Sequence, residues 1–133
     1  MRPVLAVTVL LAAILAASTA TAQNDKVVAT FESFAASGVT GDATLNPMQT
    51  GETQIRSSLK GLEPNQNYTV TIFDQSTTCG EGTNSVQIVE LKANPAGIAN
   101  FTQKVDRQIS TIQSIGVRAQ PANTLVACAT VAQ

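Results

Sequence analysis

The chain has 133 residues, of which eight are basic and nine are acidic, and it contains no histidine. Without histidine it has neither Ser-His-Asp nor Cys-His catalysis, no imidazole site for zinc or copper, and no usual general base near pH 7. The basic residues are scattered singly, which excludes the electrostatic footprint of a nucleic-acid-binding protein.

The N-terminal segment has the composition of an export signal. A short basic start, Met1–Arg2, precedes the apolar run Val4–Ala17 and the small residues Ser18–Ala22. We expect cleavage after Ala22, so that residues 1–22 are a signal peptide and residues 23–133 form one secreted, extracellular domain. No other apolar run approaches the ~20 residues that span a bilayer, and we therefore expect no membrane anchor.

The rest of the sequence alternates short strand patterns with turns. The alternation is clearest after Asn67, where Tyr68, Val70 and Ile72 share one face. Eight segments are predicted as strands: Lys26–Phe34, Val39–Leu45, Thr53–Leu59, Asn67–Phe73, Ser85–Ala93, Ile98–Val105, Thr111–Arg118 and Thr124–Val131. Their near-regular spacing predicts an all-β fold, an eight-stranded antiparallel barrel or sandwich.

Two local patterns bear on this assignment. Asn94–Gly97 has the order of a tight turn with glycine at its end. A helix over Lys104–Ser114 is the alternative to a strand there, but its β-branched residues, serine and threonine disfavour a helix.

The two cysteines are separated by 49 residues. Cys79 lies in a Gly-rich polar loop and Cys128 in the last apolar strand. An even cysteine count in an exported chain predicts a disulfide, and closing this loop stabilises the fold by ~4 kcal/mol in the chain-entropy model. The alternative is a redox-active or metal-binding thiol pair, which the long separation and the lack of a Cys-x-x-Cys pattern disfavour.

Several segments together resemble the copper/zinc superoxide dismutase family. Gly61–Pro64 resembles the turn after that family's third strand, Ala93–Ala99 its Ala-Asp-x-x-Gly-Val-Ala turn, and Leu125–Val131 its C-terminal Arg-Leu-Ala-Cys-Gly-Val-Ile. The cysteines stand where the family's disulfide joins a loop to the last strand. The resemblance covers nearly the whole mature chain and implies an eight-stranded Greek-key barrel.

The residues that would carry that family's activity are missing. Its His-x-His copper pair would fall within Tyr68–Phe73, and the loop that supplies the other histidines is reduced to Gly80–Asn84. Leu125 stands in place of the anion-guiding arginine. Because a redox copper site needs several imidazole nitrogens, we expect no metal, no cofactor and no catalytic residue.

The predicted function is therefore a secreted superoxide dismutase-like domain without dismutase activity, a pseudoenzyme that acts as an extracellular binding or structural module. The expected partner is an unidentified extracellular protein or surface ligand, and a homodimer is left open. Two alternatives remain: an antioxidant enzyme of this family with an unrecognised metal site, and an unrelated immunoglobulin-like adhesion domain.

Three groups of surface residues are candidate sites. Asn67 and Asn100 each begin an Asn-x-Thr motif, and in a eukaryotic source we expect at least one of them to carry a glycan. The polar loop Asp74–Asn84 is a candidate recognition loop or a solubilising connector. Its hydrogen-bonding residues are Ser76, Thr77, Thr78, Glu81, Thr83 and Asn84. The acidic residues are too isolated to predict a calcium site: Asp42, Glu52, Asp74, Glu81 and Asp106.

Overall fold

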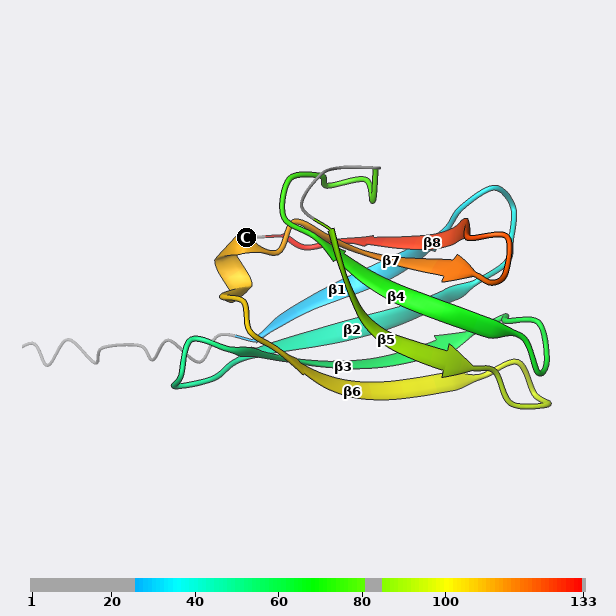
Figure 1. The fold of residues 1–133 in the computed structure, drawn as a ribbon, viewed down its shortest axis with the longest axis horizontal. Helices are drawn as coiled ribbons and strands as arrows, with labels where there is room; N and C mark the ends of the chain where they lie inside the picture. Colours follow the sequence, from blue (N-terminus) through cyan, green and yellow to red (C-terminus); the bar gives the residue numbers. More distant parts are fainter. Residues whose placement is uncertain (1–25, 81–84, 133) are drawn as a thin grey trace, which may run out of the picture.

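The computed structural model describes residues 26–80 and 85–132. The predicted signal peptide and the loop residues Glu81, Thr83 and Asn84 lie outside the described residues. Within them the chain is all-β, as predicted, with eight antiparallel strands in a nearly closed barrel (Figure 1). The strands are β1 (Val27–Ser33), β2 (Thr40–Pro47), β3 (Thr53–Lys60), β4 (Asn67–Phe73), β5 (Ser85–Lys92), β6 (Ala99–Val105), β7 (Ser114–Ala119) and β8 (Thr124–Thr130).

The strands form one sheet in the order β5-β4-β7-β8-β1-β2-β3-β6. Three of its pairs join strands that do not follow each other in the chain: β1 with β8, β3 with β6 and β4 with β7. In an immunoglobulin sandwich the second strand pairs with the fifth, whereas here β2 pairs with β1 and β3. The connectivity is therefore that of a Greek-key barrel and differs from the immunoglobulin arrangement.

The predicted alternation places the core inside the barrel. In β3, Ile55, Ser57 and Leu59 face inward and are buried, while Arg56 and Ser58 are exposed. In β4, Tyr68, Val70 and Ile72 likewise point into the core, and in β6 the inward residues are Ala99, Phe101 and Val105. A strand with a period of two puts its apolar residues on one face, and closing the sheet removes that face from water.

The predicted tight turn between β5 and β6 is confirmed. The Gly97 amide donates to the Asn94 carbonyl at 2.9 Å, and the Asn94 side-chain oxygen accepts from the Ala96 and Ile98 amides at 3.0 and 2.9 Å. Gly97 has a φ of +75°, and a Cβ there would lie 2.5 Å from the Leu62 carbonyl oxygen. Only glycine satisfies both the left-handed backbone and this close approach.

The strand predicted over Thr111–Arg118 begins later than expected. Residues Ile109–Thr111 form a short 3-10 turn, η1, and β7 starts at Ser114. The Thr111 hydroxyl donates to the Gln108 carbonyl at 2.7 Å, and such a local bond competes with the strand ladder. Neither the long helix nor the early strand forms.

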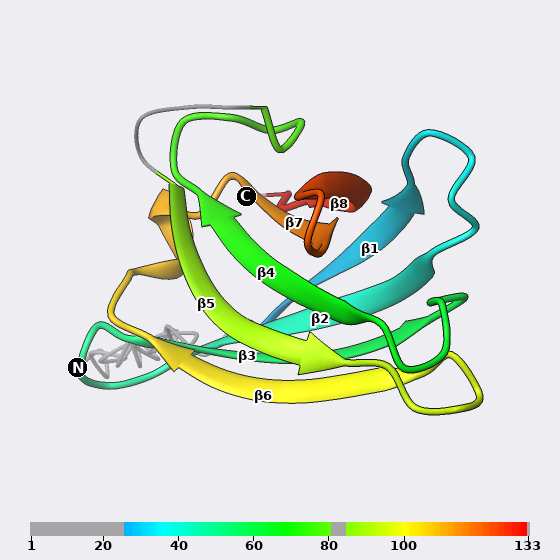
Figure 2. The same cartoon turned by 45° about the vertical axis from the view of Figure 1, so that its right-hand side comes forward.

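The barrel is not closed between its two end strands. No backbone ladder joins β5 to β6 among the described residues, because β5 pairs with β4 and β6 pairs with β3. The two strands lie close together at their connecting turn and diverge towards the start of β5 and the end of β6 (Figures 1 and 2). In the part of the chain that the structure describes, no helix has the length and apolar character to cross a membrane.

Candidate functional site

The predicted disulfide is present and fixes a loop over the outside of the barrel. Cys79 and Cys128 are bonded, with their Cα atoms 6.0 Å apart, within the ordinary range for a disulfide. Cys128 lies opposite Gly116 of β7, between the inward-facing residues Ala127 and Ala129. The segment 74–80 therefore folds back across the outer face of β7 and β8. A disulfide of this kind is typical of an oxidising compartment.

Ser114 holds the same loop by hydrogen bonds. Its hydroxyl is buried, donates to the carbonyl of Ser76 and accepts from the amide of Cys79 at 3.2 Å. The Ser76 hydroxyl in turn accepts from the Gly80 amide at 2.9 Å, and the Thr130 hydroxyl donates to the Thr77 carbonyl at 2.7 Å. Sequence reasoning missed Ser114, because a serine on the outer face of a strand gives no signal that a loop covers it.

A small apolar cluster lies beneath the loop. Phe73, Cys79 and Gly116 are all buried on the outer side of the sheet. A Cβ at Gly116 would lie 3.0 Å from the Phe73 ring and 3.2 Å from the Cys79 Cβ, closer than ordinary contact. The absence of a side chain at residue 116 therefore lets the disulfide pack flat on β7.

The disulfide and the hydrogen bonds of Ser114 together clamp the loop, and this clamp determines which of the predicted recognition residues are accessible to a ligand. Thr77 and Thr78 are exposed at the surface of the loop. Ser76 is half-buried, and its hydroxyl already serves the loop's own backbone at Gly80. Of the predicted recognition residues that the structure describes, the accessible ones are therefore the adjacent Thr77 and Thr78, held on a fixed backbone.

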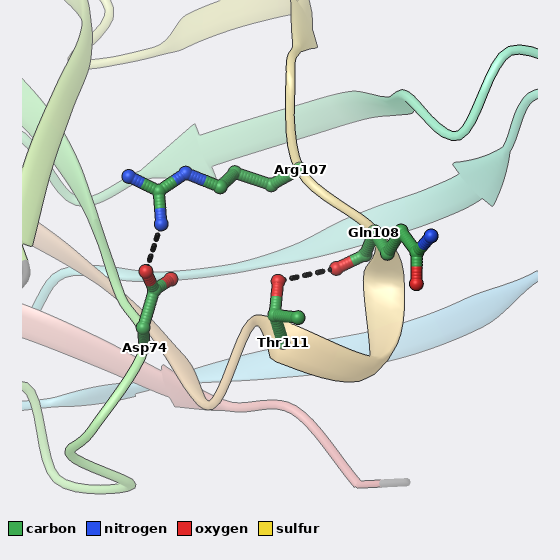
Figure 3. A network of polar contacts seen from close by, with 4 residues as sticks. All are labelled: Asp74, Arg107, Gln108 and Thr111. Carbon is green, nitrogen blue, oxygen red and sulfur yellow. Dashed lines mark hydrogen bonds and ion pairs between the residues drawn. The ribbon is translucent and has the colours of Figure 1, made fainter.

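An ion pair ties the start of this loop to the segment after β6. Figure 3 shows the Arg107 guanidinium reaching across to the carboxylate of Asp74. The Thr53 hydroxyl donates to the Arg107 carbonyl at 2.7 Å and so fixes the arginine backbone. The other carboxylate oxygen of Asp74 is buried and has no hydrogen-bond partner within the described residues.

The two Asn-x-Thr asparagines lie in separate hollows of the outer surface. Asn100 is exposed in a groove of about 570 Å³ across β2, β3 and β6, beside Arg56 and Ser58. Asn67 is exposed in a second groove of about 600 Å³, bordered by Gln120. In both motifs the middle residue points into the core, which turns the asparagine outward.

The acidic residues that the structure describes do not converge. Asp42 lies on β2, Glu52 in the turn before β3, Asp74 after β4 and Asp106 after β6. No group of three histidine, cysteine, aspartate or glutamate side chains within residues 26–80 and 85–132 is placed to hold a metal ion.

No family model matches the sequence, and no curated protein matches it either. The indications of function therefore come from the fold and from the side chains described above.

Proposed function

We propose that this chain is an exported β-barrel module, built like copper/zinc superoxide dismutase but without its activity, that binds an extracellular protein or surface ligand through residues 74–80. The observation that carries this proposal is the clamped loop. The disulfide and the Ser114 hydroxyl hold its backbone, and Thr77 and Thr78 stand exposed on it. A loop that is already ordered loses little conformational entropy on binding.

Two features support the dismutase-like scaffold. The pairing of β3 with β6 and of β4 with β7 gives the Greek-key barrel that the resemblance implies. The disulfide joins the loop after β4 to the last strand, as in that family. Export is supported by the signal-like N-terminal sequence and by the disulfide.

The residues present do not fit the copper and zinc of that family. The positions expected to hold the copper histidines lie in β4, where Tyr68, Val70 and Ile72 are buried in the core and Thr69 and Thr71 face outward. The chain contains no histidine, and both cysteines are joined to each other. Copper that cycles between two oxidation states in such a site needs several imidazole nitrogens, and this chain has none.

Metal content and superoxide consumption test the loss of activity. The full secreted protein, without an affinity tag, is analysed for bound metal before and after loading with copper and zinc, and the same samples are assayed for superoxide removal. We expect less than one metal ion per chain. After free metal is removed from the loaded sample, we expect superoxide removal no faster than in buffer alone. Stoichiometric copper together with superoxide removal would refute the inactive module and support the alternative, an enzyme with an unrecognised metal site.

Surface retention tests the binding role. Labelled protein is applied to the washed surface and matrix of the cells that export it, with unlabelled protein as competitor. We expect saturable retention that Thr77→Arg/Thr78→Arg abolishes and that Thr40→Arg, a matched change at an exposed threonine of β2, leaves intact. Retention that both variants keep would refute the loop as the binding element.

A further inference from the structure

Within residues 26–80 and 85–132, the seam between β5 and β6 is the one place where the barrel exposes unpaired strand edges to each other. Its wide part forms a hollow of about 260 Å³ between residues 86–88 of β5 and residues 103–107 at and after the end of β6. Each of these strands has a ladder on one side only. Their backbone amides and carbonyls on the seam side therefore have no strand partner within the described residues, the usual state of an edge that accepts another strand.

Apolar side chains line this hollow. Ile72 and Val105 belong to the barrel core, and the seam opens onto them. Val86 is 37% exposed, and Ile88 is half-buried against the core. An open hollow with this lining offers an apolar side chain a place out of water.

A β-bulge aims one of these side chains into the seam. Val89 pairs with Val70 and Gln87 pairs with Thr71, so Ile88 is the extra residue on β5 and has no partner on β4. Bulges of this kind re-aim a side chain and are common beside binding sites. Ile88 lines the seam as a result.

The charges around the hollow balance. Lys104 and Asp106 are exposed at its rim, and Arg107 is already paired with Asp74. The hollow therefore has no net charge that would attract a strongly charged ligand. The chemistry offered is unpaired backbone and apolar surface, which suits an extended polypeptide.

We propose that this seam is a peptide-binding site, in which an extended segment of a partner polypeptide pairs with the free edge of β5 and places an apolar side chain against Ile72, Val86, Ile88 and Val105. Main-chain hydrogen bonds give such strand addition its affinity, and the side-chain pocket gives it selectivity. The inference rests on the proposed function in that it takes the partner to be an extracellular polypeptide.

The test uses the full secreted protein and a set of fluorescent, capped hexapeptides in which threonine alternates with valine, isoleucine, leucine or phenylalanine. Binding is followed by fluorescence anisotropy, and amide hydrogen exchange locates it. We expect at least one peptide to bind with a Kd of about 100 µM or tighter and to slow amide exchange in residues 86–88. Failure of every peptide to bind at about 1 mM would overturn the proposal.

Backbone pairing and side-chain contact are tested separately. Two versions of the best peptide carry N-methyl groups on alternate backbone nitrogens, so that one version blocks the amides facing β5. We expect that version to bind about tenfold or more weakly and the other to bind like the parent, because N-methylation removes a donor from the ladder. Equal binding of both versions would overturn strand addition.

Variants of the seam complete the design. Ile88→Lys and Val86→Lys should each weaken binding about tenfold or more, since a lysine in an apolar hollow carries a desolvation cost. Val86→Lys is included because Val86 is exposed, so that this substitution disturbs the fold less. Val28→Lys, at an exposed valine on β1, is the matched control and should bind like the parent. Loss of binding in all three would indicate non-specific adsorption, and a dimer abolished by Val86→Lys would assign the seam to a second copy; both overturn the proposal.

This test is independent of the loop experiment. If no peptide binds but the cell surface still retains the protein through Thr77 and Thr78, the seam proposal fails and the module proposal stands. If the peptides bind while the protein holds copper and removes superoxide, the module proposal fails and the seam proposal stands.

Discussion

The guanidinium of Arg107 pairs with the carboxylate of Asp74 and so links the segment after β6 to the segment after β4. These strands lie on opposite sides of the seam, with β5 beside β4. At its wide end the barrel is therefore bridged by a side-chain ion pair in place of a backbone ladder.

Removing the arginine and removing the aspartate should lower the free energy of unfolding by different amounts. The side chain of Asp74 is 14% exposed and that of Arg107 is 38% exposed. Arg107→Gln leaves a mostly buried carboxylate without its cation and should lower the free energy of unfolding by about 1–2 kcal/mol. Asp74→Asn leaves an arginine whose side chain is still partly solvated and should cost about 0–1 kcal/mol.

Urea denaturation of the two single variants and the double variant measures this asymmetry. The double variant should be more stable than Arg107→Gln alone, because it removes the buried charge. A double variant that shows the simple sum of the two losses would contradict the pairing.

Gly116→Ala should destabilise the fold by about 1–3 kcal/mol, because its new Cβ would lie 3.0 Å from the Phe73 ring and 3.2 Å from the Cys79 Cβ, closer than ordinary contact. Phe73→Leu removes the ring atom that lies 3.0 Å from that Cβ and should recover part of the loss in the double variant. Thermal and chemical denaturation of the full double-mutant cycle measures the coupling. Additive losses would show that the two residues do not meet.

Ser114→Ala should lower the free energy of unfolding by about 1–2 kcal/mol, because the buried Cys79 amide and Ser76 carbonyl then lose their partner. Ser110→Ala, at an exposed serine in η1, is the matched control and should stay within about 0.5 kcal/mol of the parent. Amide exchange should also quicken at Cys79 in the Ser114 variant alone. Unchanged exchange there would mean that the serine does not hold the loop.

Replacing both cysteines by alanine should lower the free energy of unfolding by about 2–4 kcal/mol, since the unfolded chain regains the entropy of a 49-residue loop. Guanidinium denaturation of the double variant beside the oxidised parent measures the loss. The variant should also lose retention at cell surfaces if the clamp orders Thr77 and Thr78. Full retention by the variant would separate the disulfide from the binding role.

Local sequence determined the strands and their inward faces. The alternation through Ile55, Ser57 and Leu59 is enough to assign β3 and its buried side, because side-chain direction in a strand depends only on position parity. The Asn94–Gly97 turn follows from the same kind of local rule. The cysteine pairing could also be predicted, because there are only two cysteines and the N-terminal sequence predicts export.

Only the tertiary structure decided where these pieces meet. Ser114 and Arg56 are both polar residues at outward positions of their strands. Ser114 is nevertheless buried beneath the loop of residues 74–80, whereas Arg56 is exposed to solvent. The bulge at Ile88 and the seam beside it depend on the register of β5 against β4 and on β6 pairing with β3. These are contacts between residues far apart in the chain, whose formation depends on how the whole barrel packs, so no periodicity within one segment encodes them.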